Sequence, residues 1–179
     1  MSLSITTVAI GNPGNTADRN GLGWVDHNSA IGTHEVTISQ YSQFLNAVGA
    51  SDPYQLYNPS LMTNALNGGI KRSGSDGNYS YIPTPGTERY PITGLSWLDA
   101  ARFANWLSNG QPAGVQTALT TEDGACTMSP DAINRKLAVT RNTIDPNTQK
   151  AVSHFIPTEN EWYKSAYFNP DLNQGAGGY

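Results

Sequence analysis

Apolar residues recur at helical spacing between residues 37 and 48. They occupy positions i, i+3, i+4 and i+7: Tyr41, Phe44, Leu45 and Val48. This spacing places them on one face of an α-helix, and Gly49 stands where a helix commonly ends. The pattern predicts an amphipathic helix over residues 37–48.

A second stripe of the same kind lies between residues 96 and 108, at Ala100, Phe103, Ala104 and Leu107. Ser96 and Asp99 precede it at the spacing of a capping box, in which each side chain bonds the backbone of the other residue. Gly110 follows the stripe. We predict a second amphipathic helix over residues 96–108.

A third helix is predicted over residues 158–168. Thr158 and Glu161 again have capping-box spacing, and Pro170 disfavours helix at the residue before it. Trp162 and Ala166 would share one face. We therefore expect Trp162 to be buried, and to pack with Phe44 and Phe103 of the other two helices.

The remaining segments are rich in turn residues. A hairpin is predicted from residues 69–73, a Gly-Ser-Asp-Gly turn at 74–77, and the alternating pattern of residues 78–82. It lies within a proline-rich connection over residues 49–92. A second long connection, over residues 110–153, has no clear period, and loops of this length are commonly functional or specific to a family.

Composition sets the broad class. At 179 residues the chain has the size of one domain, 1–179. Its 13% of charged residues, with 18 Gly and 11 Pro, favours a loop-rich fold over long regular elements. Trp97, Trp106 and Trp162 are expected in its core, because large aromatic rings supply much of the burial in such a fold.

Charge and hydropathy exclude two classes of partner. A net charge of −4 without a run of Lys or Arg argues against nucleic-acid binding. No apolar stretch approaches the roughly 20 residues of a membrane span.

The first residues have neither the basic start nor the apolar centre of a secretory signal. One cysteine allows no intrachain disulfide and leaves the redox compartment open.

The sequence contains few candidates for catalytic or metal-binding residues. His27, His34 and His154 lack metal-site spacing, and structural roles are favoured for them. Cys126 has no activating base beside it in the sequence, so we expect an inert thiol. We therefore assign no catalytic residue, no cofactor-binding residue and no metal ligand, and the identity of any cofactor stays open.

Several short motifs are better explained by backbone turns. Gly11–Gly14 lacks the Lys-Ser/Thr ending of a phosphate-binding loop. The Asp-Gly pairs at 76–77 and 123–124 could offer carboxylates to calcium, yet they lack EF-hand spacing and are first of all turn dipeptides. Packing is also favoured for the aromatic residues of the loops and hairpin, with ligand binding as the alternative: Trp24, Tyr54, Tyr57, Tyr79 and Tyr81.

Three blocks of the chain, in order, resemble one family. HFIPTENEWY at residues 154–163 is similar to the "R-L-P-T-E-x-E-W-E" motif of the formylglycine-generating, or sulfatase-modifying factor, family. GTHEVTISQYSQFLN at 32–46 and YPITGLSWLDAARFANWL at 90–107 resemble its "E-V-T-N-x-x-Y-x-x-F" and "P-V-x-x-V-S-W-x-D-A-x-x-Y-x-x-W-L" segments. The opening at 8–15 resembles a secreted bacterial branch. The resemblance implies an α+β fold of C-type lectin-like type, outside the cytoplasm.

The family's chemistry does not transfer directly. The resemblance implies copper-dependent oxidation of a cysteine in a client sulfatase, using a cysteine pair that follows the Pro-Thr-Glu block, as do the calcium ligands. Cys126 precedes that block and is the chain's one cysteine. A related branch of iron-dependent sulfoxide synthases is disfavoured, because its histidine motif is not visible.

The sequence is therefore compatible with two functions. The leading one is a non-catalytic or incomplete binding or scaffold module, with a protein or a carbohydrate as its ligand. The alternative is a formylglycine-generating oxidase whose catalytic C-terminal portion lies outside this chain. In that case we expect a complementing C-terminal chain to cover apolar surface and strand edges.

Overall fold

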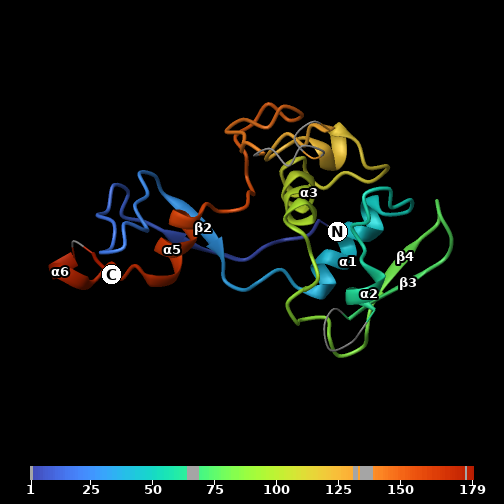
Figure 1. Ribbon diagram of the computed structural model, residues 1–179, viewed down its shortest axis with the longest axis horizontal. Coiled ribbons are helices and arrows are strands. Elements are labelled where there is room, and N and C mark those ends of the chain that lie inside the picture. Colours follow the sequence, from blue (N-terminus) through green and yellow to red (C-terminus); the bar gives the residue numbers. More distant parts are fainter. Residues whose placement is uncertain (1, 64–68, 131–132, 134–138, 176) are drawn as a thin grey trace. The chain divides into compact units, whose positions relative to one another are not determined.

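The computed structural model describes residues 2–63, 69–130, 133, 139–175 and 177–179. The rest, including parts of the two long connections predicted over 49–92 and 110–153, lies outside the described residues. The chain forms two compact units (Figure 1). Unit 1 comprises Met1–Leu3 and Glu35–Ile156, and unit 2 comprises Ser4–His34 and Pro157–Tyr179.

The two helices of the apolar stripes both lie in unit 1. They are α1 (Ile38–Val48) and α3 (Trp97–Ser108). The capping box predicted for α3 is present, since Asp99 N donates to Ser96 Oγ at 3.2 Å and Ser96 N donates to Asp99 Oδ2 at 2.8 Å. Gly49 caps the end of α1. Both helix predictions are confirmed.

Aromatic rings join α1 to α3. The ring of Phe44 lies 5.3 Å, centroid to centroid, from those of both Phe103 and Trp106. Tyr41 also contacts Phe103, and all four side chains are buried. Such pairs stabilise by about 0.5–1.5 kcal/mol each beyond the area that they bury. The predicted contact between Phe44 and Phe103 and the burial of Trp106 are confirmed.

The predicted hairpin also belongs to unit 1. Strands β3 (Ile70–Ser73) and β4 (Ser80–Pro83) pair antiparallel, with Ile70 opposite Pro83. A short helix, α2 (Pro59–Met62), precedes them, and a π-helical turn, η1 (Ala118–Glu122), follows α3 along the chain. Tyr57 and the β4 residue Tyr81 are buried and their rings contact each other, which supports packing rather than ligand binding for these two.

Unit 2 contains one strand pair and two helices. β1 (Thr7–Ile10) and β2 (Ser29–Gly32) pair antiparallel, with Thr7 opposite Gly32. α5 (Glu159–Tyr167) is the third predicted helix, and it begins with the predicted capping box of Thr158 and Glu161. A single turn, α6 (Leu172–Gly175), follows. Within the described residues, helices combine with antiparallel pairs only, so the fold class is α+β.

Two tryptophans predicted in the core are exposed, which corrects the prediction. Trp97 is 49% exposed because it is the first residue of α3, at the end of the buried face. Trp162 is 50% exposed, and Ala166 is exposed too. The reason is that the buried residues of α5 are Glu161 and Lys164, so its buried face is polar and the aromatic ring points elsewhere.

No helix in the described part of the chain has the length and apolar character that a membrane crossing requires.

Candidate functional site

The buried face of α5 is fastened to the N-terminal loop of unit 2 by polar contacts. Glu161, 4% exposed, accepts a hydrogen bond from the backbone N of Thr158 at 2.7 Å and contacts His27 Nε2 at 2.9 Å. The other ring nitrogen of His27 lies 2.8 Å from Asp26. The hydrogen bond to Asp26 is the largest cause that raises the pKa of His27, and the hydrogen bond to Glu161 raises it further. The imidazolium form is therefore favoured.

Two further side chains of α5 bind the same loop. Lys164 is 1% exposed, and its Nζ donates to the carbonyl of Asn12 at 2.8 Å. Burial lowers the pKa of this ammonium group. Asn160 Oδ1 accepts a hydrogen bond from the backbone N of Gly23 at 2.9 Å. These contacts hold α5 in a fixed orientation against residues 12–27.

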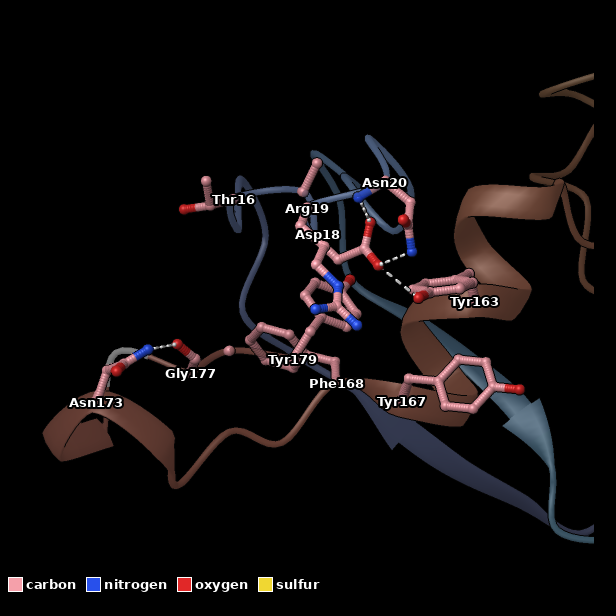
Figure 2. A pocket seen from close by; sticks show the side chains of 12 residues that line it. Thr16, Asp18, Arg19, Asn20, Tyr163, Tyr167, Phe168, Asn173, Gly177 and Tyr179 are labelled. Carbon is pink, nitrogen blue, oxygen red and sulfur yellow. Dashed lines mark hydrogen bonds between the residues drawn. The ribbon is translucent and has the colours of Figure 1, made fainter.

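This attachment shapes a pocket of about 730 Å³ entirely within unit 2 (Figure 2). Its wall combines aromatic rings with polar side chains from three segments of the chain. The lining residues are Thr16, Ala17, Asp18, Arg19, Asn20, Tyr163, Tyr167, Phe168, Asn173, Gly177, Gly178 and Tyr179. Its volume is within the range of small-molecule sites, about 300–1,000 Å³.

The aromatic rings of the pocket form a continuous series. Tyr163 lies between Tyr167 and Tyr179, with centroid distances of 4.8 and 5.6 Å. Tyr179 also meets Phe168 edge-on at 5.4 Å. Because each ring is supported by its neighbours, the rings present their faces with little freedom to lose on binding.

Asp18 fixes the polar side of the pocket. Its carboxylate accepts hydrogen bonds from the Tyr163 hydroxyl at 2.5 Å, from Asn20 N and Nδ2 at 2.7 and 3.0 Å, and from Leu22 N at 3.1 Å. The bond from Tyr163 is the largest cause that lowers the pKa of Asp18, and it raises the pKa of Tyr163 in turn. The pair therefore consists of a carboxylate and a neutral phenol at pH 7.

Two glycines allow the aromatic wall to form. Gly177 has φ +81°, and a side chain there would meet the ring of Phe168. Gly23 has φ +85°, and a side chain there would meet Tyr179, whose hydroxyl donates to the Gly23 carbonyl at 2.7 Å. Both positions combine a positive φ with close ring contact, so each requires glycine.

Three polar side chains of the wall remain available to a ligand. The side chains of Thr16, Arg19 and Tyr167 make no hydrogen bond or ion pair with other residues that the structure describes. In Figure 2 the side chain of Arg19 extends toward the rings of Phe168 and Tyr179. The pocket thus offers unpaired donors and acceptors beside rings that contact one another at tilted angles.

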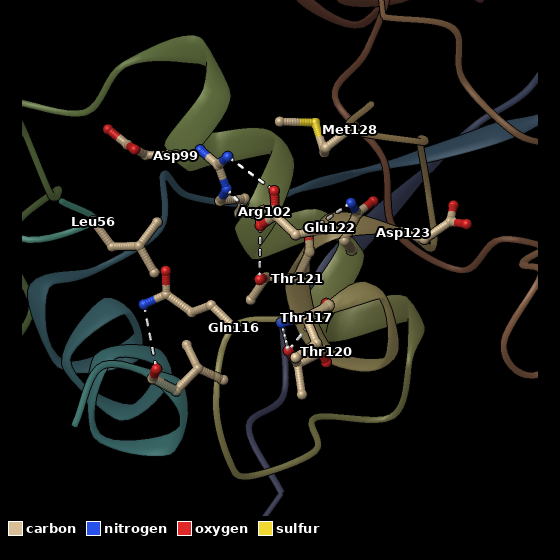
Figure 3. A network of polar contacts seen from close by, with 12 residues as sticks. Leu56, Asp99, Arg102, Gln116, Thr117, Thr120, Thr121, Glu122, Asp123 and Met128 are labelled. Atoms are coloured by element: carbon tan, nitrogen blue, oxygen red, sulfur yellow. Dashed lines mark hydrogen bonds and ion pairs between the residues drawn. The ribbon is translucent and has the colours of Figure 1, made fainter. Parts of the chain in front are cut away.

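Unit 1 contains a separate polar network between α3 and η1 (Figure 3). Arg102 Nε and Nη2 donate to the two carboxylate oxygens of Glu122 at 2.7 and 2.9 Å. The guanidinium also lies 4.2 Å from the ring centroid of Tyr54, which gives that ring a structural contact. Burial raises the pKa of Asp99 on the same helix. Arg102 and Glu122 satisfy each other, and Asp99 accepts a hydrogen bond from Ser96 N, so we assign these groups to stability.

The thiol of Cys126 lies in this unit as well. It is 7% exposed, with Asn105 Oδ1 at 3.6 Å and Met128 Sδ at 3.8 Å from its Sγ. Burial is the first cause that raises its pKa to about 11. A thiol with such a pKa is almost fully protonated at pH 7, whereas nucleophilic attack and metal ligation need the thiolate.

The other histidines that the sequence offered do not line the pocket. His34 is exposed and contacts Thr33, and His154 contacts Ser153. Burial lowers the pKa of His154. In the described residues, no three His, Cys, Asp or Glu side chains are grouped as metal ligands would be.

The predicted turn motifs likewise have structural contacts. Asp76 accepts a hydrogen bond from Ser51 Oγ at 2.6 Å, and Asp123 Oδ1 accepts one from Thr127 Oγ1 at 2.8 Å. Gly14 N donates to the carbonyl of Val25 at 2.8 Å. Ser96 caps α3, as predicted.

The pocket residues were not predicted from the sequence. One available signal is the density of aromatic residues after residue 161, namely Trp162, Tyr163, Tyr167, Phe168 and Tyr179. Another is the polar, glycine-containing loop at residues 16–21. Neither signal shows that the two segments meet.

A family model described as a sulfatase-modifying factor enzyme 1-like domain matches residues 21–169. The match contains all three sequence blocks at 32–46, 90–107 and 154–163. Neither the curated proteins nor the solved structures contain a significant match. Residues 16–20 and 173–179 of the pocket lie outside the matched region.

Proposed function

The chain belongs to the sulfatase-modifying factor family, and we propose that it is a non-catalytic or incomplete domain of that family that binds a ligand through the pocket of unit 2. The pocket itself carries the proposal, because it combines supported aromatic rings with polar side chains that have no partner in the described residues. A concave site with a few convergent polar groups is the usual form of a small-molecule site.

The non-catalytic part of the proposal is supported by the thiol chemistry. The family's oxidation of cysteine depends on a reactive cysteine pair, as the resemblance implies. This chain has one cysteine, and burial holds its pKa near 11. We further propose the C-type lectin-like fold of the family, with which the antiparallel pairs and helices are compatible, and a location outside the cytoplasm.

A screen that assumes no ligand class tests the binding role. The full chain is exposed to a library of small polar and aromatic fragments, and binding is followed by ligand-observed NMR. We expect hits that the variant Tyr167→Ala weakens and Trp24→Ala retains, since both rings are exposed and only Tyr167 lines the pocket. If no fragment binds, or if Tyr167→Ala changes no hit, the proposed function is wrong.

A second experiment tests the absence of catalysis. The copper-loaded chain is incubated with oxygen and a cysteine-containing sulfatase peptide, and the peptide is analysed by mass spectrometry. Formylglycine should not exceed the level of a copper-only control. Product above that level that Cys126→Ser abolishes would contradict the proposal and the assignment of Cys126 as inert.

A further inference from the structure

We propose that the pocket of unit 2 is a saccharide site that takes a pyranose of one or two rings. This inference rests on the proposed binding function and names the ligand class of the same pocket. It concerns residues that lie in part outside the family match, so the family's own chemistry does not account for them.

The aromatic wall fits the apolar face of a sugar ring. A pyranose presents axial C–H groups on its faces, and these are attracted to the negative face of an aromatic ring. Tyr163, Tyr167 and Tyr179 supply such rings in a supported series. Tyr167 is 57% and Tyr179 is 37% exposed, so part of each ring remains available for contact.

The polar groups of the pocket fit hydroxyl groups. Each sugar hydroxyl donates one hydrogen bond and accepts others, so a sugar site needs donors and acceptors close together. Arg19 contributes only donors, whereas the hydroxyls of Thr16 and Tyr167 can do both. Side chains of these three residues have no hydrogen-bonding partner in the described residues, so a ligand can bind them without breaking existing bonds.

The hydrogen bonds of Asp18 hold this arrangement in place. Four donors from Tyr163, Asn20 and Leu22 occupy its carboxylate. They orient the Tyr163 ring at the centre of the aromatic series and also stabilise the negative charge of Asp18. A purely apolar ligand would cover the guanidinium of Arg19 without offering it a hydrogen bond, which costs binding free energy. A hydroxylated ligand avoids this cost, because its hydroxyl groups accept hydrogen bonds from Arg19.

Titration calorimetry with four disaccharides tests the proposal on the full chain. The probes are cellobiose, maltose, N,N′-diacetylchitobiose and digalacturonate. We expect at least one to bind with a Kd of about 1 mM or below. The variant Tyr167→Ala should weaken that binding by about tenfold, and Arg19→Ala should weaken it as well.

Trp24→Ala is the matched control. Trp24 lies in unit 2 with 52% exposure and does not line the pocket, so its removal should leave the Kd within about twofold of the wild-type value. Circular dichroism of each variant confirms that the fold is retained, as expected for exposed side chains.

The outcomes separate the ligand class from the function. Binding that is weakened by both pocket variants and kept by the control supports the saccharide site. Binding that the pocket variants leave unchanged overturns it. If no disaccharide binds while other fragments bind through Tyr167, the saccharide proposal is wrong and the binding module stands. If nothing binds, both proposals fail.

Discussion

Removing Arg102 should destabilise unit 1 far more than removing an ordinary surface arginine. The Arg102 side chain is 4% exposed and the Glu122 side chain 13% exposed, and two hydrogen bonds of 2.7 and 2.9 Å join them. In the variant Arg102→Met the carboxylate of Glu122 stays largely buried without its cation. It retains the hydroxyl of Thr121, which donates to it at 2.9 Å.

The magnitude follows from the burial of the pair. Breaking a buried ion pair by removing one partner costs about 3–5 kcal/mol. Because Glu122 keeps one hydrogen bond and some contact with solvent, we expect the lower end, about 3 kcal/mol. That loss is a large part of the roughly 5–15 kcal/mol that stabilises a folded domain. In a chain of this length it corresponds to a fall in Tm of roughly 6–12 °C.

Urea unfolding of three variants measures the effect. Arg102→Met should lose about 3 kcal/mol. Arg89→Met serves as the control, because Arg89 is exposed and has no partner in the described residues, and it should change stability by under about 0.5 kcal/mol. The double variant Arg102→Met/Glu122→Leu should recover about half of the loss or more, since it leaves no unpaired charge.

If Arg102→Met costs no more than Arg89→Met, the pair contributes nothing measurable to stability. The network in Figure 3 would then be a consequence of folding rather than one of its causes.

Three further predictions address other groups. The raised pKa of His27 implies stabilisation that is full below its ordinary value of 6.5 and lost as pH rises through the raised value, so the Tm advantage over His27→Gln should shrink as pH rises above 6.5; an advantage that grows contradicts it. Cys126 should react with Ellman's reagent slowly in the native chain and rapidly in urea, because burial raises its pKa; equal rates would show an accessible thiolate. Gly177→Ala should reduce ligand binding, because the new side chain would displace Phe168. Gly14→Ala should not, since Gly14 also has a positive φ but lies in open space. If both variants lose ligand binding equally, backbone strain at a positive φ would explain the loss instead.

The local elements were predictable because their signals lie close together in the sequence. The stripes of α1 and α3 repeat over three turns, and the hairpin has its turn residues between alternating strands. Caps and apolar periods of this kind act within a few residues. The elements that depend on such signals were confirmed.

The orientation of α5 was not predictable in the same way. Its sequence offers Trp162 as the apolar residue to bury, yet Glu161 and Lys164 are buried instead. Their partners, His27 and Asn12, lie more than 130 residues earlier in the chain. A sequence pattern cannot show such partners, because a carboxylate or ammonium group is expected at the surface unless something distant satisfies it.

The pocket was missed for the same reason. Tyr163 and Tyr167 lie on one side of it, while Asp18 and Arg19 come from the start of the chain and Tyr179 from its end. Each segment taken alone is typical of a helix or a turn. Only the folded unit brings the contacting aromatic rings and the unpaired polar groups together.

Amide chemical shifts show where a saccharide binds, and so whether it occupies the pocket of unit 2. The ¹⁵N-labelled full chain is titrated with the disaccharide that binds best. We expect shifts concentrated at Arg19, Asn20, Tyr167 and Gly178, which line the pocket, with little change along α1 and α3. Shifts concentrated in α1, α3 or the hairpin, with the pocket amides unmoved, would contradict this expectation.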